Sequence, residues 1–131
     1  MAVLIVEDNP TNAMIIKHLA KKVTSKEIKV AGDGNTALML CHTESFEILI
    51  VDYQLPGMSG LQFVKAVRLM DRYCDTPVVM VTADDQPRLC EEAKAAGVTD
   101  FLRKPVEAVA FRKLLADHLG AEAVHPELRS A

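Results

Sequence analysis

The stretch that decides the fold is Glu47-Ile48-Leu49-Ile50-Val51-Asp52-Tyr53-Gln54-Leu55-Pro56-Gly57-Met58-Ser59-Gly60. It joins a mostly apolar run, residues 47–51, to a loop rich in proline and glycine, and Asp52 stands at the junction. A short continuous apolar run is typical of a strand that is buried on both faces of a parallel sheet. Functional side chains of α/β proteins lie just beyond the carboxyl ends of such strands. Asp52 is therefore the first candidate functional residue.

The rest of the chain repeats the pattern of a strand, a loop and a helix. Four more strands are predicted at residues 3–6, 27–31, 77–81 and 98–102. Helices are predicted at residues 12–22, 35–42, 61–70, from Asp84-Asp85-Gln86-Pro87 to Gly97, and at 106–119 before Gly120. Residues 9–11, Asn-Pro-Thr, supply a cap and a first-turn proline to the first helix. Five such repeats predict an α/β fold, a doubly wound five-stranded parallel sheet with helices on both faces.

Composition and charge narrow the class of protein. The 131 residues suit one domain, and 50% hydrophobic with 25% charged residues is typical of a globular protein. The net charge of −3 and the lack of a basic run argue against direct nucleic-acid binding by this domain. The three cysteines form no CxxC motif and are predicted to be reduced thiols. No apolar stretch approaches the ~20 residues of a membrane span, and residues 1–6 are too short for a signal peptide. We expect a cytoplasmic protein without membrane contact.

The ends of four predicted strands carry polar side chains that fit one site. These residues are Glu7 and Asp8, Asp52, Thr82, and Lys104. Parallel strands all end at one edge of a sheet, so the side chains should converge there. Three neighbouring carboxylates repel one another and raise one another's pKa, and a hard cation such as Mg²⁺ relieves that repulsion. With a lysine and a hydroxyl beside them, they suit phosphoryl transfer to a carboxylate.

Each of these residues also has an ordinary structural interpretation. Glu7 and Asp8 could cap the following helix, and Asp52 could cap a turn. Thr82 could be plain loop, and Lys104 a solvated lysine before a proline. The position of all of them at successive strand ends of one sheet favours a common site.

With these motifs in place, the chain resembles the receiver domain of a two-component response regulator over residues 1 to about 119. The resemblance rests on Glu7-Asp8, on Asp52 with Pro56 and Gly60 at offsets four and eight, on Thr82-Ala83, and on Asp100-Phe101-Leu102-Arg103-Lys104-Pro105. It implies a flavodoxin-like fold with strand order 2-1-3-4-5. It also implies a signalling module that catalyses its own phosphorylation and dephosphorylation, rather than an enzyme acting on other substrates.

The resemblance assigns a metal-binding role to four residues. Asp52 would be the phosphoacceptor. The side chains of Asp8 and Asp52, with the backbone carbonyl of Gln54, would bind Mg²⁺. Glu7 would hold the ion mainly through water.

The resemblance also implies how the phosphoryl group is held. Lys104 and the Thr82 hydroxyl would each contact one of its oxygens, and the backbone N–H groups of Tyr53 and Ala83 would complete the cradle. The bond between Lys104 and Pro105 would be cis, as X–Pro bonds allow.

A switch is implied at Thr82 and Phe101. The phosphoryl group would draw the Thr82 hydroxyl inward, and Phe101 would move into the vacated space, although Phe101 could also be a plain core aromatic. The face made by helix four, strand five and helix five would then change. The positions of Gln54 and Asp84 would tune the lifetime of the acyl phosphate, but for Asp84 the favoured interpretation is a cap of helix four.

The resemblance implies a histidine kinase or a phosphotransfer protein as phosphodonor. The output domain or protein is unknown, and a homodimer through the helix-four to helix-five face is a hypothesis. We assign residues 1–120 to the receiver domain and residues 121–131 to a tail or the start of a linker. Two other classes are an interaction domain that has lost regulation and a dehalogenase-type phosphatase. The phosphatase is disfavoured because it needs a second aspartate where Gln54 stands. Nucleotide binding is disfavoured because neither a P-loop nor GxGxxG is present.

Overall fold

The computed structural model describes residues 2–83 and 87–119 and contains one parallel sheet. Its strands are β1 (Ala2–Val6), β2 (Glu27–Ala31), β3 (Phe46–Asp52), β4 (Val78–Thr82) and β5 (Asp100–Arg103). The order across the sheet is β2-β1-β3-β4-β5, and every neighbouring pair is parallel. The predicted fold class and strand order are confirmed.

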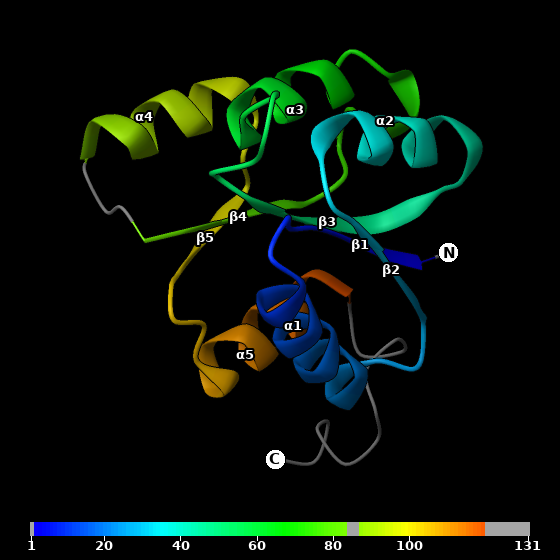
Figure 1. Cartoon of the computed structure of the whole chain (residues 1–131), viewed down its shortest axis with the longest axis vertical. Coiled ribbons are helices and arrows are strands. Elements are labelled where there is room, and N and C mark those ends of the chain that lie inside the picture. The colour runs from blue at the N-terminus through cyan, green and yellow to red at the C-terminus, as the bar shows by residue number, and fades with distance from the viewer. Residues whose placement is uncertain (1, 84–86, 120–131) are drawn as a thin grey trace.

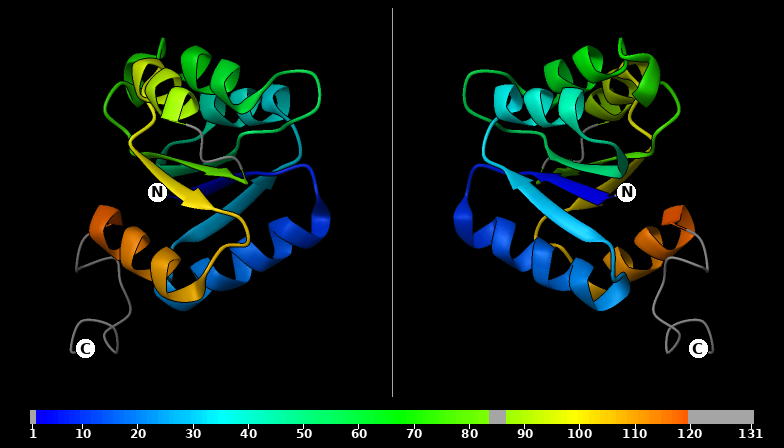
Figure 2. Two further views of the ribbon diagram at one scale, coloured as in Figure 1. Left: turned by 90° about the vertical axis from the view of Figure 1, so that its left-hand side faces the viewer. Right: turned by 90° about the vertical axis from the view of Figure 1, so that its right-hand side faces the viewer.

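Helices cover both faces of this sheet. They are α1 (Pro10–Val23), α2 (Gly34–Thr43), α3 (Gly60–Val67), α4 (Pro87–Ala96) and α5 (Ala108–Leu119), with a short 3₁₀ helix η1 (Asp71–Tyr73) after α3. Figure 1 shows α2, α3 and α4 on one face of the sheet and α1 and α5 on the other, and the two side views of Figure 2 agree. Two buried apolar clusters result, one on each face of the sheet. Because both faces are covered, the strands of residues 48–51 and 78–81 are buried throughout, as their apolar sequences require.

Local side-chain bonds fix where the helices begin. The Asn9 side chain accepts from the N–H groups of Thr11 and Asn12, so the predicted cap of α1 is confirmed. Ser59 and Gln62 form a reciprocal capping box at the start of α3. This start matters for function because α3 follows directly on the loop after Asp52.

Four predicted element ends were wrong by two or three residues. Helix α1 begins at Pro10 rather than at residue 12. Helix α3 ends at Val67 rather than at residue 70, because the N–H groups of Leu69 and Met70 bond three residues back, in 3₁₀ turns. Strand β5 begins at Asp100 rather than at residue 98, because the Val98 N–H still bonds to the end of α4. Helix α5 begins at Ala108, two residues later than predicted.

Some predictions fall outside the described residues. These concern residues 84–86 before α4, Asp84 included, and residues 120–131 after α5.

All three cysteines are free: Cys41 is buried, Cys74 is exposed and Cys90 is intermediate in burial. In the part of the chain that the structure describes, no helix has both the length and the apolar character needed to cross a membrane.

Candidate functional site

Three carboxylates meet at the carboxyl edge of the sheet. Glu7 and Asp8 follow β1, and Asp52 is the last residue of β3, its direct neighbour. One oxygen from each carboxylate lies within 4.8 Å of one from each of the others. Glu7 and Asp52 are buried and Asp8 is exposed, so the cluster opens to solvent on the Asp8 side. The predicted convergence of these carboxylates is confirmed.

Asp52 is held at both oxygens of its carboxylate. Its Oδ2 lies 2.9 Å from the Lys104 Nζ, and its Oδ1 accepts from the backbone N–H of Gln54 at 3.2 Å. Only 5% of Asp52 is exposed. The carboxylate is therefore fixed in orientation while one side of it faces the other two acids.

Among the three acids, Glu7 has the surroundings least favourable to its negative charge. Burial and then the closeness of the Asp52 carboxylate raise the pKa of Glu7 from 4.5 to about 7, although the Asn9 N–H and the Lys104 charge oppose this. The Oε2 of Glu7 accepts from the Asn9 N–H at 3.3 Å. Its Oε1 is buried and makes no hydrogen bond, although the Lys104 Nζ lies 3.4 Å away. A buried carboxylate oxygen without a hydrogen bond is costly and indicates a missing partner.

Lys104 enters the site from β5. The Lys104 N–H donates to the Thr82 carbonyl at 3.0 Å, which places the two strand ends side by side. Burial lowers the pKa of Lys104, but the bond and charge of Asp52 and then Glu7 outweigh it, and the net pKa is raised. The lysine therefore stays charged beside the acids. The bond from Lys104 to Pro105 is cis, as predicted.

The residues present fit a divalent cation. The acid cluster offers three carboxylates within reach of one ion, and the Glu7 oxygen without a hydrogen bond is the sign of an incomplete set of partners. Carboxylate oxygens on an open, solvent-facing side match the preference of Mg²⁺, which keeps several waters.

The remaining predicted site residues are placed as follows. Thr82 is buried at the end of β4, and Ala83 after it is exposed. Phe101 is half-buried and packs against the apolar cluster on the α2–α4 face. The Tyr53 N–H donates to the Val81 carbonyl at 3.0 Å. It therefore does not face Asp52 in this structure, and its role in the cradle stays a prediction without geometric support.

Sequence reasoning missed the two backbone groups that do orient the acids. The N–H of Gln54 bonds to Asp52, and the N–H of Asn9 bonds to Glu7, each two residues along the chain. The signal for both was present, because an acid at a strand end readily bonds the backbone two residues on.

Gly60 ties the start of α3 to the site. Its N–H donates to the Tyr53 carbonyl at 2.9 Å, and a Cβ at this position would lie 2.3 Å from the Asp52 carbonyl oxygen. Only glycine allows the helix to approach the end of β3 this closely. The offset of eight residues between Asp52 and Gly60 thus has a steric reason.

A cavity of about 440 Å³ adjoins the site. It lies between the first turns of α1 and the segment before α5 and is lined by Glu7, Asn12, Ile15, Ile16, Lys104, Pro105 and Val106. Its walls are mainly apolar, and Glu7 and Lys104 connect it to the acid cluster. Ile15, which lines it, is 49% exposed. Large exposed apolar side chains next to a functional site favour a protein contact there.

Fold and site together define a parallel α/β domain with an acidic, cation-compatible centre and a lysine at its carboxyl edge. A family model described as the response regulator receiver domain matches residues 3–116. The chemotaxis protein CheY of Pseudomonas aeruginosa is 37% identical over 113 residues, which cover 86% of this chain and 91% of that protein.

Solved structures give the same result. Chemotaxis protein CheY4 of Vibrio cholerae superposes with a TM-score of 0.84 at 33% identity, covering 89% of this chain and 97% of that chain. The receiver domain of the Saccharomyces cerevisiae response regulator Ssk1, solved with the histidine phosphotransfer signaling protein Ypd1, gives 0.81 at 26% identity, covering 90% and 88%. The chain belongs to the response regulator receiver domain family, and its role is that of a phosphoacceptor signalling module.

Proposed function

We propose that Asp52 accepts a phosphoryl group from a phosphohistidine of a histidine kinase or phosphotransfer protein in an Mg²⁺-dependent reaction. The observation that carries the proposal is the convergence of Asp52 with Glu7, Asp8 and the Lys104 ammonium at one sheet edge. The co-crystal of Ypd1 with the Ssk1 receiver supports the class of donor.

The transfer exchanges one bond for another. An oxygen of the Asp52 carboxylate forms the bond to phosphorus, the phosphorus–nitrogen bond of the donor breaks, and the imidazole leaves with the electron pair. The product is an acyl phosphate on Asp52. Lys104, already 2.9 Å from the carboxylate, supplies a positive charge for the phosphoryl oxygens. Thr82 at the end of β4 supplies a hydroxyl, and the N–H of Ala83 is a further candidate donor.

Mg²⁺ would be held by the side chains of Asp8 and Asp52 and the Gln54 carbonyl, with Glu7 acting mainly through water. When bound, it would neutralise charge on the phosphoryl oxygens. The Gln54 N–H keeps the Asp52 carboxylate oriented.

The donor is proposed to dock over the cavity between α1 and the segment before α5. This mainly apolar cavity adjoins the acid cluster, because Glu7 belongs to the cluster and also lines the cavity, together with Lys104. An apolar contact there would exclude water from the site during transfer.

The structural change caused by phosphorylation of Asp52 is proposed to reach the surface through Thr82 and Phe101. Thr82 ends β4, and Phe101 lies on the neighbouring strand β5, paired with Met80. Phe101 is half-buried, so its side chain can move further into the core. Because a phenyl ring forms no conventional hydrogen bond, this movement breaks none. The face of α4, β5 and α5 would then be the output surface.

A labelling experiment tests the proposal. Radiolabelled acetyl phosphate with Mg²⁺ should label the protein once, Asp52→Asn should abolish the label, and EDTA should prevent it. Asp71→Asn is the matched control, because Asp71 is exposed in η1, between the end of α3 and the start of β4, at the opposite edge of the sheet. A label that survives Asp52→Asn would disprove the assignment. A wild-type protein that takes no label would favour an interaction domain without regulation.

The output stays a prediction. A homodimer through the face of α4, β5 and α5 should double the mass seen by light scattering when beryllofluoride and Mg²⁺ are added. An unchanged mass would count against it. The cytoplasmic location, the boundary at residue 120 and the linker role of residues 121–131 also stay predictions.

A further inference from the structure

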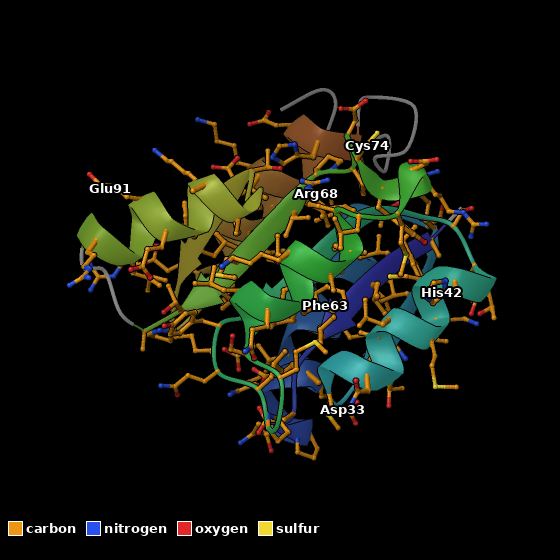
Figure 3. The ribbon with its side chains drawn as sticks, turned by 90° about the horizontal axis from the view of Figure 1, so that it is seen from above. Asp33, His42, Phe63, Arg68, Cys74 and Glu91 are labelled. Atoms are coloured by element: carbon orange, nitrogen blue, oxygen red, sulfur yellow. The ribbon has the colours of Figure 1, made fainter. Side chains whose placement is uncertain are left out.

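The C-terminal end of α4 is held by one side chain that follows α3. Both the Nε and the Nη2 of Arg68 donate to the Gly97 carbonyl, at 3.2 and 2.7 Å, and the Nη1 donates to the Tyr73 carbonyl. Figure 3 shows Arg68 where α3 and α4 come together. One guanidinium thus joins α3, η1 and the end of α4, and hydrogen bonds from a charged donor are stronger than neutral ones.

Gly97 is shaped for this contact. Its φ of 112° lies in a region that favours glycine, and a Cβ there would be 2.8 Å from the Arg68 Nε. The N–H of Gly97 and that of Val98 both bond to the Ala93 carbonyl, at 3.1 and 2.9 Å, which closes the helix. The next N–H, of Thr99, bonds to the Val78 carbonyl of the sheet at 2.8 Å. This end of α4 is therefore fixed by its own closing hydrogen bonds, by the Arg68 side chain and by the sheet.

The rest of α4 is attached by few side chains. Among its described side chains, residues 88–96, only Leu89 and Ala93 are buried. The exposed ones are Arg88, Glu91, Glu92, Lys94 and Ala95. The N-terminal end of α4 is the end that follows β4, and so Thr82, along the chain. At that end the buried Leu89 packs against the core, whereas the far end, besides the buried Ala93, is also held by the Arg68 bonds that a displacement would have to break.

We propose that Arg68 is a positioning residue that makes Gly97 the pivot of the phosphorylation-dependent change in α4. The inference rests on the proposed function of Asp52 and adds where the motion stops. Arg68 contacts neither the phosphoryl group nor the metal ligands. It acts by holding one end of the helix while the end near Thr82 is displaced.

The test is an NMR titration with beryllofluoride and Mg²⁺, read at backbone amides. In the wild type, shift changes should be large in the first turns of α4 and at Phe101 and should fade toward residues 97–99. In Arg68→Ala the changes should extend through residues 97–99. Hydrogen exchange at the Gly97 and Val98 amides should also become faster by about tenfold or more without any ligand.

Two further variants keep the test decisive. Arg68→Lys keeps one charged donor for the Gly97 carbonyl and should restore most of the fading pattern, which also covers a failure of Arg68→Ala to fold. Tyr73→Phe is the control, because it removes a hydrogen bond beside η1 but leaves the carbonyl that Arg68 uses. Its pattern of shift changes along α4 should match that of the wild type.

The outcomes separate the two proposals. Equal shift changes along the whole of α4 in the wild type, or identical patterns in the wild type and Arg68→Ala, would overturn the pivot and leave the function of Asp52 intact. A wild type that responds nowhere would overturn the proposed function itself.

Discussion

Gly60→Ala should destabilise the protein through one added methyl group. The new Cβ would lie 2.3 Å from the Asp52 carbonyl oxygen, 2.9 Å from the Tyr53 Cα and 3.1 Å from the Asp52 carbonyl carbon. All three atoms belong to the backbone at the end of β3, so no side chain can turn away. Either α3 or the end of β3 must shift, although the start of α3 is bonded to the Tyr53 carbonyl.

The expected loss follows from two opposing effects. Overpacking a dense region costs roughly 1–3 kcal/mol and occasionally more, and the backbone position of the clash favours the upper end. Replacing glycine by alanine in a helix returns up to about 1 kcal/mol. The free energy of unfolding should therefore fall by about 2–3 kcal/mol.

Urea denaturation followed by far-UV circular dichroism measures this change. Gly32→Ala is the matched control, because nothing lies within 4 Å of its Cβ position and no positive φ is found there. It should leave stability within about 0.5 kcal/mol of the wild type. Because the clash displaces the Asp52 backbone, Gly60→Ala should also slow labelling by acetyl phosphate. A Gly60→Ala protein as stable as Gly32→Ala would refute the steric argument.

The other predictions concern charge, metal and packing. The folded pKa of Glu7, about 7, is above its ordinary 4.5. The stability that protonated Glu7 contributes is therefore fully present below pH 4.5 and is lost as the pH rises through about 7. In EDTA this loss should be at most about 3 kcal/mol, and Glu7→Gln should flatten the curve of unfolding free energy against pH; equal slopes would contradict this. Mg²⁺ at ten times its Kd should add about 1.4 kcal/mol to stability in urea melts, and Asp8→Asn should remove most of this gain; an unchanged gain would place the ion elsewhere. Tyr73→Phe removes the hydroxyl that donates to the Glu44 carbonyl and should cost about 1–2 kcal/mol, which a shift in the urea midpoint would show.

Much of the fold could be read from local sequence. Buried strands such as residues 48–51 and 78–81 are short apolar runs, and their parallel pairing follows from the helices between them. The ends of the elements were harder to predict, because they depend on which of two competing carbonyl groups a backbone N–H bonds. Val98 looks like the start of β5, but its N–H bonds to Ala93 at the end of α4.

The site divides in the same way. The sequence by itself determined which residues stand at the strand ends, because strand period and chain order are local properties: Asp52, Lys104 and the Glu7-Asp8 pair were predicted from them. Only the tertiary structure decided that Lys104 bonds to Asp52 and that Glu7 is buried with a raised pKa. It also decided that Arg68 holds Gly97, 29 residues further along the chain. These properties depend on distances and burial between distant segments, which no local pattern specifies.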